Sequence, residues 1–417
     1  MSLSRRGFLK GSVAAALLAE LGAARALAAD QISKAAGAGG AEAYSLQSGL
    51  TYLNHASVGT IPTIVREAHA RYLRICESNP WLYIWSDPWR DSIAQVRDQF
   101  AALFGCRAER VALTHNTTEV MNLVAHGLPL DPGDEVLFSS LNHDGASVCW
   151  QMRAPERGFS VRRFDFDLAQ TEALDPDAIV ARYAEAIGPK TRVLVLPHID
   201  NIIGLAHPIT ALAKMARERG VRWIIVDGAQ SAGMLELGDS VAHADVYAVS
   251  AHKWLQAPKG LGAACFSDAA LEAIRPMWVT WGQERWHDAR RFEDYGTRAL
   301  PAVMALGDAL RFQAGIDPAQ RRAHHQRMRR HLVGRVSDQP GLRWNSPHHP
   351  ALATAIHSIQ LEHEAANEAA RRLFAEHDIV VRPFEGPEIN ALRVSPNLNN
   401  TEADLDRLID ALHPIVT

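Results

Sequence analysis

A lysine in the middle of the chain has the setting of a reactive amine. The short apolar run 246–249 leads into Ser250, His252 and Lys253, and a turn rich in proline and glycine follows. This pattern places Lys253 at the mouth of a buried strand. A lysine in a partly dehydrated pocket loses part of its preference for the charged form, and the neutral amine can form a Schiff base with an aldehyde. A surface lysine after an edge strand is the alternative.

An aspartate ends an earlier apolar run, 223–226, far enough upstream for one helix and one further strand to lie in between. A carboxylate at the end of a buried strand is costly to keep charged without a cationic partner. A protonated pyridine nitrogen would be such a partner, and the ring of pyridoxal 5'-phosphate (PLP) needs an acid there to act as an electron sink. Asp227 and Lys253 would then hold this cofactor from neighbouring strands. A capping aspartate before a glycine turn is the alternative.

Candidate phosphate donors stand at a helix start. Thr117 and Thr118 follow the apolar run 110–113 and open a helix. Such a start presents backbone N–H groups and hydroxyls, which are the donors that a phosphate needs. Ser250 and His252 flank the lysine and are further candidate donors. An ordinary helix N-cap is the alternative for the two threonines.

Three more polar residues are candidates for contact with the cofactor ring. His143 could stack on the ring face, and Asn201 and Gln230 could hydrogen-bond its phenolic oxygen. His143 and Asn201 stand at or just beyond the ends of apolar runs, and ligands of parallel sheets bind outside the carboxyl ends of the strands. We therefore expect these residues to share a site with Asp227 and Lys253, although a single histidine is more often structural.

The elements that must position these residues alternate along the chain. Strands are expected at 135–139, 161–164, 192–197 and 223–226, and helices at 146–154, 178–187 and 209–219. This alternation predicts an α/β fold, a mostly parallel sheet with helices on both faces. Residues 315–417 are expected to form a smaller α+β domain, with helices at 364–377 and 402–412 and strands at 354–361, 379–382 and 391–395. The large domain is then 44–314, and its first segment is expected to pack with the small domain.

The N-terminus has the features of an export signal. Arg5 and Arg6 precede a modest apolar run, 11–24, and residues 26–28 have the small-x-small form of a cleavage site. Residues 1–28 therefore resemble a twin-arginine signal peptide, followed by a linker at 29–43. We expect the twin-arginine translocase to deliver the folded protein, with its cofactor, to the periplasm. An amphipathic leader helix or an uncleaved membrane anchor is the alternative.

Composition argues against some partners. The net charge of −4 shows no excess of basic residues, so nucleic acid is not an expected partner. The four cysteines are widely spaced and contain no CxxC, which signals neither a zinc site nor a disulfide scaffold. One disulfide bond is possible in an oxidising compartment, and the sequence does not pair its cysteines.

These motifs together resemble those of a known enzyme family. The chain is similar to PLP-dependent enzymes of fold type I, in the class V aminotransferase family, and within it to the isopenicillin N epimerase-like branch. The resemblance rests on His143 and on the stretches 52–56, 116–118, 226–230, 250–254, 281–282 and 295–297. It implies that Lys253 forms the Schiff base with PLP, that Asp227 pairs with the pyridine nitrogen, and that His143 stacks on the ring. The groups that hold the phosphate would be Thr118, Ser250 and His252.

The resemblance also implies a substrate site and a dimer. Arg393 matches the arginine that binds the substrate carboxylate by a bidentate fork, and Asn54 is assigned to the same site. A structural ion pair is the alternative for Arg393. The family forms homodimers with shared active sites, in which Gly296 and Thr297 of the partner would close the phosphate site.

One departure from the family separates this chain from cysteine desulfurases. Those relatives carry a persulfide-forming cysteine shortly before the position of Arg393, whereas residues 380–387 contain none and no cysteine follows Cys265. Desulfuration by a mobile cysteine is therefore disfavoured.

The expected chemistry begins at the amino-bearing carbon of a small-molecule substrate. A substrate amine displaces Lys253, and the freed lysine acts as the base. Epimerisation, transamination, elimination and decarboxylation diverge after that step and all stay open. An exported relative modifies a glutamyl residue of the siderophore pyoverdine, so the leader favours a periplasmic modification of a peptide-like natural product. A PLP-fold protein that has lost its chemistry and serves in binding is the non-enzyme alternative.

Overall fold

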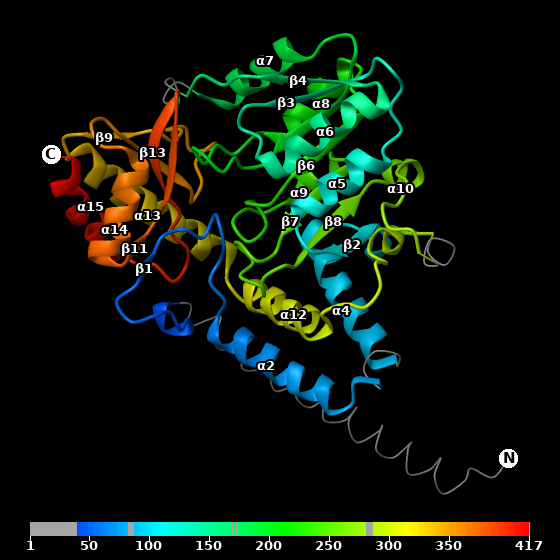
Figure 1. Ribbon diagram of the computed structural model, residues 1–417, viewed down its shortest axis with the longest axis horizontal. Helices are drawn as coiled ribbons and strands as arrows, with labels where there is room; N and C mark the ends of the chain where they lie inside the picture. The colour runs from blue at the N-terminus through cyan, green and yellow to red at the C-terminus, as the bar shows by residue number, and fades with distance from the viewer. Residues whose placement is uncertain (1–39, 82–86, 169–170, 172–173, 281–286, 417) are drawn as a thin grey trace, which may run out of the picture.

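A central seven-stranded sheet organises the larger part of the molecule (Figure 1). The structure is a computed structural model and describes residues 40–81, 87–168, 171, 174–280 and 287–416. The strand order is β2-β8-β7-β6-β5-β3-β4. The strands are β2 (Val111–Thr114), β3 (Glu135–Ser139), β4 (Ser160–Phe164), β5 (Thr191–Pro197), β6 (Trp223–Asp227), β7 (Val246–Ser250) and β8 (Gly262–Phe266). All run parallel except β8, which is antiparallel to both of its neighbours, so the predicted mostly parallel sheet is confirmed.

Successive residues of every strand except the edge strand β4 enter separate hydrophobic clusters on the two faces of the sheet. In β6, Ile224 belongs to one cluster and Ile225 to the other. Helices α4 (Asp87–Phe104), α7 (Pro176–Ala186), α8 (Ile209–Glu218) and α12 (Leu300–Ala314) contribute to the first cluster. The second receives α5 (Thr117–Gly127), α6 (Asp144–Arg157) and α10 (Asp268–Ala273). Burial on both faces explains why these strands are continuous apolar runs in the sequence.

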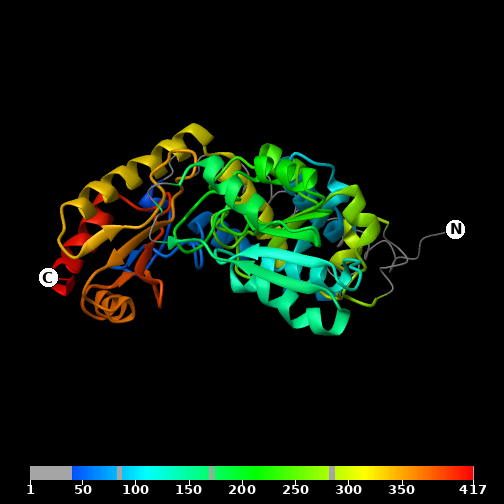
Figure 2. The ribbon, with the colours of Figure 1, turned by 90° about the horizontal axis from the view of Figure 1, so that it is seen from above.

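The chain beyond α12 forms a second body beside the first (Figure 2). Its four-stranded sheet has the order β12-β13-β10-β9, with every pairing antiparallel. The elements are α13 (Pro318–Ser337), β9 (Leu342–Trp344), β10 (His357–Leu361), α14 (Ala366–His377), β12 (Arg382–Gly386), β13 (Ile389–Val394) and α15 (Glu402–Val416). This arrangement is the smaller α+β part that the sequence predicted.

The first described segment joins the two bodies. Strand β1 (Thr51–Tyr52) pairs in parallel with β11 (Ile379–Val380), and Leu53 is buried in the hydrophobic cluster of the second body. The chain then enters α2 (Thr63–Ser78), which packs along α12 of the first body. The residues between β1 and α2 therefore cross from one body to the other.

Several predictions fall on residues outside the described ranges. These are the signal peptide at 1–28, residues 29–39 of the linker, and the 281–282 stretch; the end of the linker forms η1 (Ala41–Ala43). No helix in the described part of the chain is long and apolar enough to cross a membrane. In the same ranges, no cluster of three or more His, Cys, Asp or Glu side chains is placed to hold a metal ion.

Candidate active site

A cavity of about 260 Å³ lies where β5, β6 and β7 end and α5 and α6 begin. Every cofactor-binding residue predicted from the sequence lines it except Thr297. The lining residues are Ser57, Asn116, Thr117, Thr118, His143, Gly145, Pro197, Ile199, Asn201, Asp227, Ala229, Gln230, Ser250, His252 and Lys253. The parallel strands place these residues together because the carboxyl ends of β5, β6 and β7 share one edge of the sheet.

Lys253 and Asp227 are the charged pair of this cavity. Burial lowers the pKa of Lys253 to about 8, although the nearby charge of Asp227 opposes the shift. The Asp227 carboxylate is 7% exposed, accepts a hydrogen bond from Ala229 N–H at 2.9 Å, and has no described cation within ion-pair distance. A buried carboxylate with one neutral donor fits a protonated pyridine nitrogen, and a half-buried amine of lowered pKa fits an aldehyde.

The starts of α5 and α6 form a cradle for an anion. Asn116 caps α5, since its Oδ1 accepts a hydrogen bond from Glu119 N–H. Ser250 Oγ lies 3.1 Å from both the N and the Oγ1 of Thr117, so the end of β7 is fastened to the first turn of this helix. An added Cβ on Gly145 would come 2.5 Å from Thr118 Oγ1, which shows how closely the two helix starts approach. Helix N-termini that approach one site direct backbone N–H groups toward it, which favours the binding of a phosphate.

His143 is the N-cap of α6 and also lines the cavity. Its Nδ1 accepts the Gly145 N–H at 3.0 Å. Burial lowers the pKa of His143, and the charge of Lys253 acts in the same direction. A neutral imidazole with its Nδ1 engaged in this way suits the predicted contact with an aromatic ring.

The crossing segment packs directly on the lysine. Gly59 N–H donates to His252 O at 2.8 Å, and an added Cβ on Gly59 would lie 1.8 Å from Lys253 O. Only glycine therefore fits at this position. Sequence reasoning missed it, because nothing in the local pattern shows which distant backbone it meets.

Arg393 is buried beside the cavity and is held by neutral groups. It is 3% exposed and donates to Asn201 O and Asn54 Oδ1, both at 2.9 Å, and to Ser57 Oγ at 2.5 Å. Its Nε has no partner, and no described carboxylate lies within ion-pair distance. Burial lowers its pKa to about 10, and the charge of Arg382 contributes. The structural ion pair is thus absent from the described residues, and the guanidinium fits a substrate carboxylate.

A second arginine extends this region. Arg382, Phe384 and Arg393 line an adjoining cavity of about 380 Å³. It shares with the cofactor cavity the lining residues Ser57, His143, Asn201, Gln230 and Lys253. Arg382 stands opposite Arg393 in the β12–β13 pairing. The guanidinium carbons of Arg382 and Arg393 lie 6.0 and 5.5 Å from the centre of the Phe384 ring. The sequence reading missed both Arg382 and Phe384.

Two predicted contacts look different in the structure. Gln230 donates to Ala56 O at 2.9 Å and accepts from Trp254 Nε1 at 2.7 Å, so its amide already links two protein segments. Thr297 lines a separate cavity next to α2, with Cys76 among its neighbours. Its predicted role belongs to a dimer partner, so it stays a prediction.

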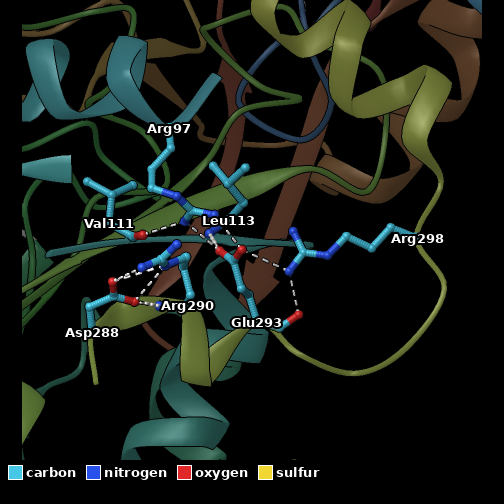
Figure 3. Close-up of polar contacts among 7 residues, drawn as sticks. All are labelled: Arg97, Val111, Leu113, Asp288, Arg290, Glu293 and Arg298. Carbon is cyan, nitrogen blue, oxygen red and sulfur yellow. Dashed lines mark hydrogen bonds and ion pairs between the residues drawn. The ribbon is translucent and has the colours of Figure 1, made fainter. Parts of the chain in front are cut away.

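A buried ion-pair network anchors the strand that leads to Thr117 (Figure 3). Arg97 donates to both carboxylate oxygens of Glu293, at 2.8 and 2.6 Å, and to Val111 O at 2.7 Å. Glu293 also accepts Leu113 N–H and pairs with Arg298. Burial alone would raise the pKa of Glu293, but the charges of Arg298 and Arg97 hold it below its usual value. The network thereby fixes β2 and the start of α5.

The fold and this pocket together define a PLP-binding protein of fold type I. Solved structures support this class: C-DES with glycine covalently linked to its PLP cofactor, and the cystine C-S lyase C-DES in complex with cysteine persulfide, each match with a TM-score of 0.79 and 25% identity. Both matches cover 88% of this chain, and they cover 97% and 98% of the respective solved chains.

The sequence comparisons then give the family. Residues 51–408 match the family described as aminotransferase class-V, and the chain belongs to that family. It is 32% identical to the isopenicillin N epimerase of Amycolatopsis lactamdurans over 89% of this chain and 96% of that protein. A probable cysteine desulfurase of Pseudomonas aeruginosa is 30% identical over 87% of this chain and 93% of its own length. The protein is thus a PLP-dependent, class V aminotransferase-like enzyme.

Proposed function

We propose that this enzyme acts at the amino-bearing carbon of an amino acid or peptide-like natural product. The observation that carries the proposal is a half-buried lysine of lowered pKa near two unmatched charges, the Asp227 carboxylate and the Arg393 guanidinium. Arg393 binds the substrate carboxylate and so directs the neighbouring amine and carbon toward Lys253. With a pKa of about 8, a useful fraction of Lys253 is neutral near pH 7 and can accept the proton of that carbon. When bound, PLP supplies the electron sink that stabilises the resulting charge.

The substrate class is tested with the PLP-loaded protein in D2O. Free amino acids and small peptides are incubated with it, and proton exchange at the amino-bearing carbon is followed by NMR, with chirality and keto-acid formation measured on the same samples. We expect exchange with at least one substrate, and none with Lys253→Ala. An enzyme that exchanges no substrate proton, while it still binds PLP, would instead be the catalytically lapsed binding protein.

Epimerisation is the first reaction to test, with transamination second. Support comes from the relatives of this chain, which include isopenicillin N epimerases of Amycolatopsis lactamdurans and Streptomyces clavuligerus. An epimerase returns the proton to the carbon, so chirality is lost without a keto acid. A stoichiometric keto acid would assign the chain to transamination instead.

We also propose that the enzyme is not a cysteine desulfurase of the persulfide type. None of the residues lining the two cavities is a cysteine, and the β12–β13 hairpin beside Arg393 contains none. We expect no sulfide release from cysteine in the presence of a reductant. Sulfide release that is lost in one of the cysteine-to-serine variants would reverse this conclusion.

The site of action is proposed to be the periplasm, with maturation of a pyoverdine-like siderophore as the specific hypothesis. The support is the twin-arginine leader in the sequence. Fractionation of cells that express the full chain should place it in the periplasm, and lysine substitutions at Arg5 and Arg6 should retain it in the cytoplasm. Turnover of free amino acids without turnover of peptidic siderophore precursors would reject the specific hypothesis and leave the enzyme class intact.

A homodimer with a shared site is proposed as the working assembly. Thr297 lies outside the cofactor cavity of its own chain, as is expected of a residue that contributes to the phosphate site of the partner subunit. Light scattering should give a dimer mass, and Thr297→Val should weaken PLP binding without changing that mass. A monomer with full PLP affinity would contradict the assembly.

A further inference from the structure

Two of the four cysteines meet at the end of the sheet away from the cofactor cavity. Cys265 is 3% exposed on β8, at the position opposite Val111 of β2. Cys106 follows α4 and is partly exposed, with its N–H bonded to Ala101 O at 2.9 Å. Both side chains contact the hydrophobic cluster on the same face of the sheet. The pair is 159 positions apart in the chain and shares one local environment.

The backbone around Cys106 is fastened onto the end of β8. Arg110 Nε donates to Phe266 O at 2.5 Å, one residue beyond Cys265. Arg107 pairs with Asp268 at 2.8 Å. Each of the two thiols is the largest single influence on the pKa of the other, so the two groups are neighbours at this junction. This contact therefore comes from the packing of two elements and not from chance proximity of mobile side chains.

The two thiols differ in the way that an attacking and a resolving thiol differ. The Cys265 thiol, together with the charges of Arg110 and Arg107, lowers the pKa of Cys106 although burial opposes it. The Cys106 thiol and burial raise the pKa of Cys265. The thiol that is partly exposed is thus also the one with more thiolate character.

We propose that Cys106 and Cys265 are a disulfide-forming site, in which Cys106 attacks an external disulfide and Cys265 resolves the product. The Cys106 thiolate attacks one sulfur of the external disulfide, which forms a mixed disulfide and releases one thiolate. Cys265 then loses its proton and attacks the Cys106 sulfur, which forms the internal bond and releases the second thiolate. The two protein thiols lose two electrons and two protons, and the external disulfide is reduced to two thiols.

The bond would brace the sheet without entering the active site. Cys265 lies at the far end of β8 from Gly262, whose strand partner Ser250 lines the cofactor cavity. Neither cysteine lines that cavity or the adjoining one. Closing a loop of this length removes much conformational freedom from the unfolded chain. The oxidised protein should therefore melt at a temperature higher by on the order of 5 °C, with its activity unchanged.

The test uses the PLP-loaded full chain in a buffer of oxidised glutathione. After equilibration, free thiols are alkylated and the protein is digested without reductant for mass spectrometry. We expect two thiols to resist alkylation and one cross-linked peptide that joins Cys106 to Cys265. Four free thiols, or glutathione retained on Cys106 of the wild type, would overturn the proposal; this readout needs no variant to fold.

Variants separate the two roles. Cys265→Ser should trap glutathione on Cys106, and Cys106→Ser should leave Cys265 reduced. Cys76→Ser and Cys149→Ser are the matched controls, because burial raises the pKa of Cys76 to about 12 and that of Cys149 to about 11. Both control variants should still form the cross-link, and oxidation should raise their melting temperatures by the same amount as that of the wild type. A cross-link that involves Cys76 or Cys149 would overturn the pairing.

Discussion

Arg393→Lys should remove most of the enzyme's preference for substrates that carry a carboxylate. Arginine holds three protein acceptors and presents a planar fork, whereas lysine has a single ammonium group that cannot reach Asn201 O, Asn54 Oδ1 and a substrate carboxylate in the same geometry. Loss of one partner from a buried, charge-assisted contact costs about 2 to 4 kcal/mol. This corresponds to roughly 30- to 1000-fold in affinity or in kcat/KM.

The assay compares an amino acid with the amine that lacks its carboxylate. Each is titrated into the PLP-loaded protein, and the change in visible absorbance gives an apparent affinity. The wild type should prefer the amino acid, and Arg393→Lys should lose that preference by the factor given above, with little change for the amine. This design isolates the contact between the carboxylate and residue 393, as a double-mutant cycle does.

Arg382→Lys is the matched control, because it changes the same residue type directly opposite in the hairpin. Arg382 is exposed and has no described ion pair. It should keep the preference for the α-carboxylate within about threefold. Equal losses in both variants would show that the two arginines act through general positive charge, and an unchanged preference in Arg393→Lys would refute its assignment as the carboxylate site.

Three further predictions concern the parts that hold the pocket. Glu293→Gln should lower the free energy of unfolding by about 3 kcal/mol in urea denaturation, because Arg97 loses its buried counter-charge. The control Glu368→Gln, on an exposed ion pair, should leave the urea midpoint almost unchanged. Since the pKa of Glu293 is lowered on folding, this stabilisation is present above the unfolded pKa of about 4.3 and is lost as the pH falls further. For the PLP-free protein, the rate of cofactor attachment should rise as the pH passes about 8, where Lys253 becomes neutral; a rate that stays flat between pH 6 and pH 9 by stopped-flow absorbance would contradict the lowered pKa. Gly59→Ala should reduce bound PLP at least tenfold by equilibrium dialysis, since its Cβ would meet Lys253 O, and full occupancy would show that the segment can move aside.

The sequence predicted those parts of the site that end apolar runs. Asp227 is the last residue of β6 and Lys253 follows β7. Both strands are buried on both faces, and such strands are visible as uninterrupted hydrophobic stretches. The parallel arrangement then determines that their ends meet. The resemblance to class V enzymes added Arg393 as the group that binds the substrate carboxylate. It also showed that residues 380–387 lack the cysteine that desulfurases carry there.

The remaining contacts depend on registers and close approaches that no local pattern encodes. Arg382 faces Arg393 only because of the pairing of β12 with β13, and Gly59 meets Lys253 across nearly two hundred residues. The amide of Gln230 was expected at the cofactor, but its hydrogen bonds go to Ala56 and Trp254, which the fold brings to it. The alternation of strands and helices and the composition of the chain cannot reveal such pairs. These patterns show which face of an element is buried, but not which distant residues pack against that face.

The central claim, that Lys253 is the residue that binds PLP covalently, is tested most directly by borohydride reduction of the PLP-loaded protein followed by peptide mapping. Reduction fixes the cofactor permanently to the amine that carries it. We expect the label on Lys253 alone, and an unlabelled protein for Lys253→Ala. Lys259 is the internal control, because burial lowers its pKa as well but its Nζ is bonded to Gly59 O at 2.5 Å. A label on Lys259, or on any lysine of the Lys253→Ala variant, would contradict the account.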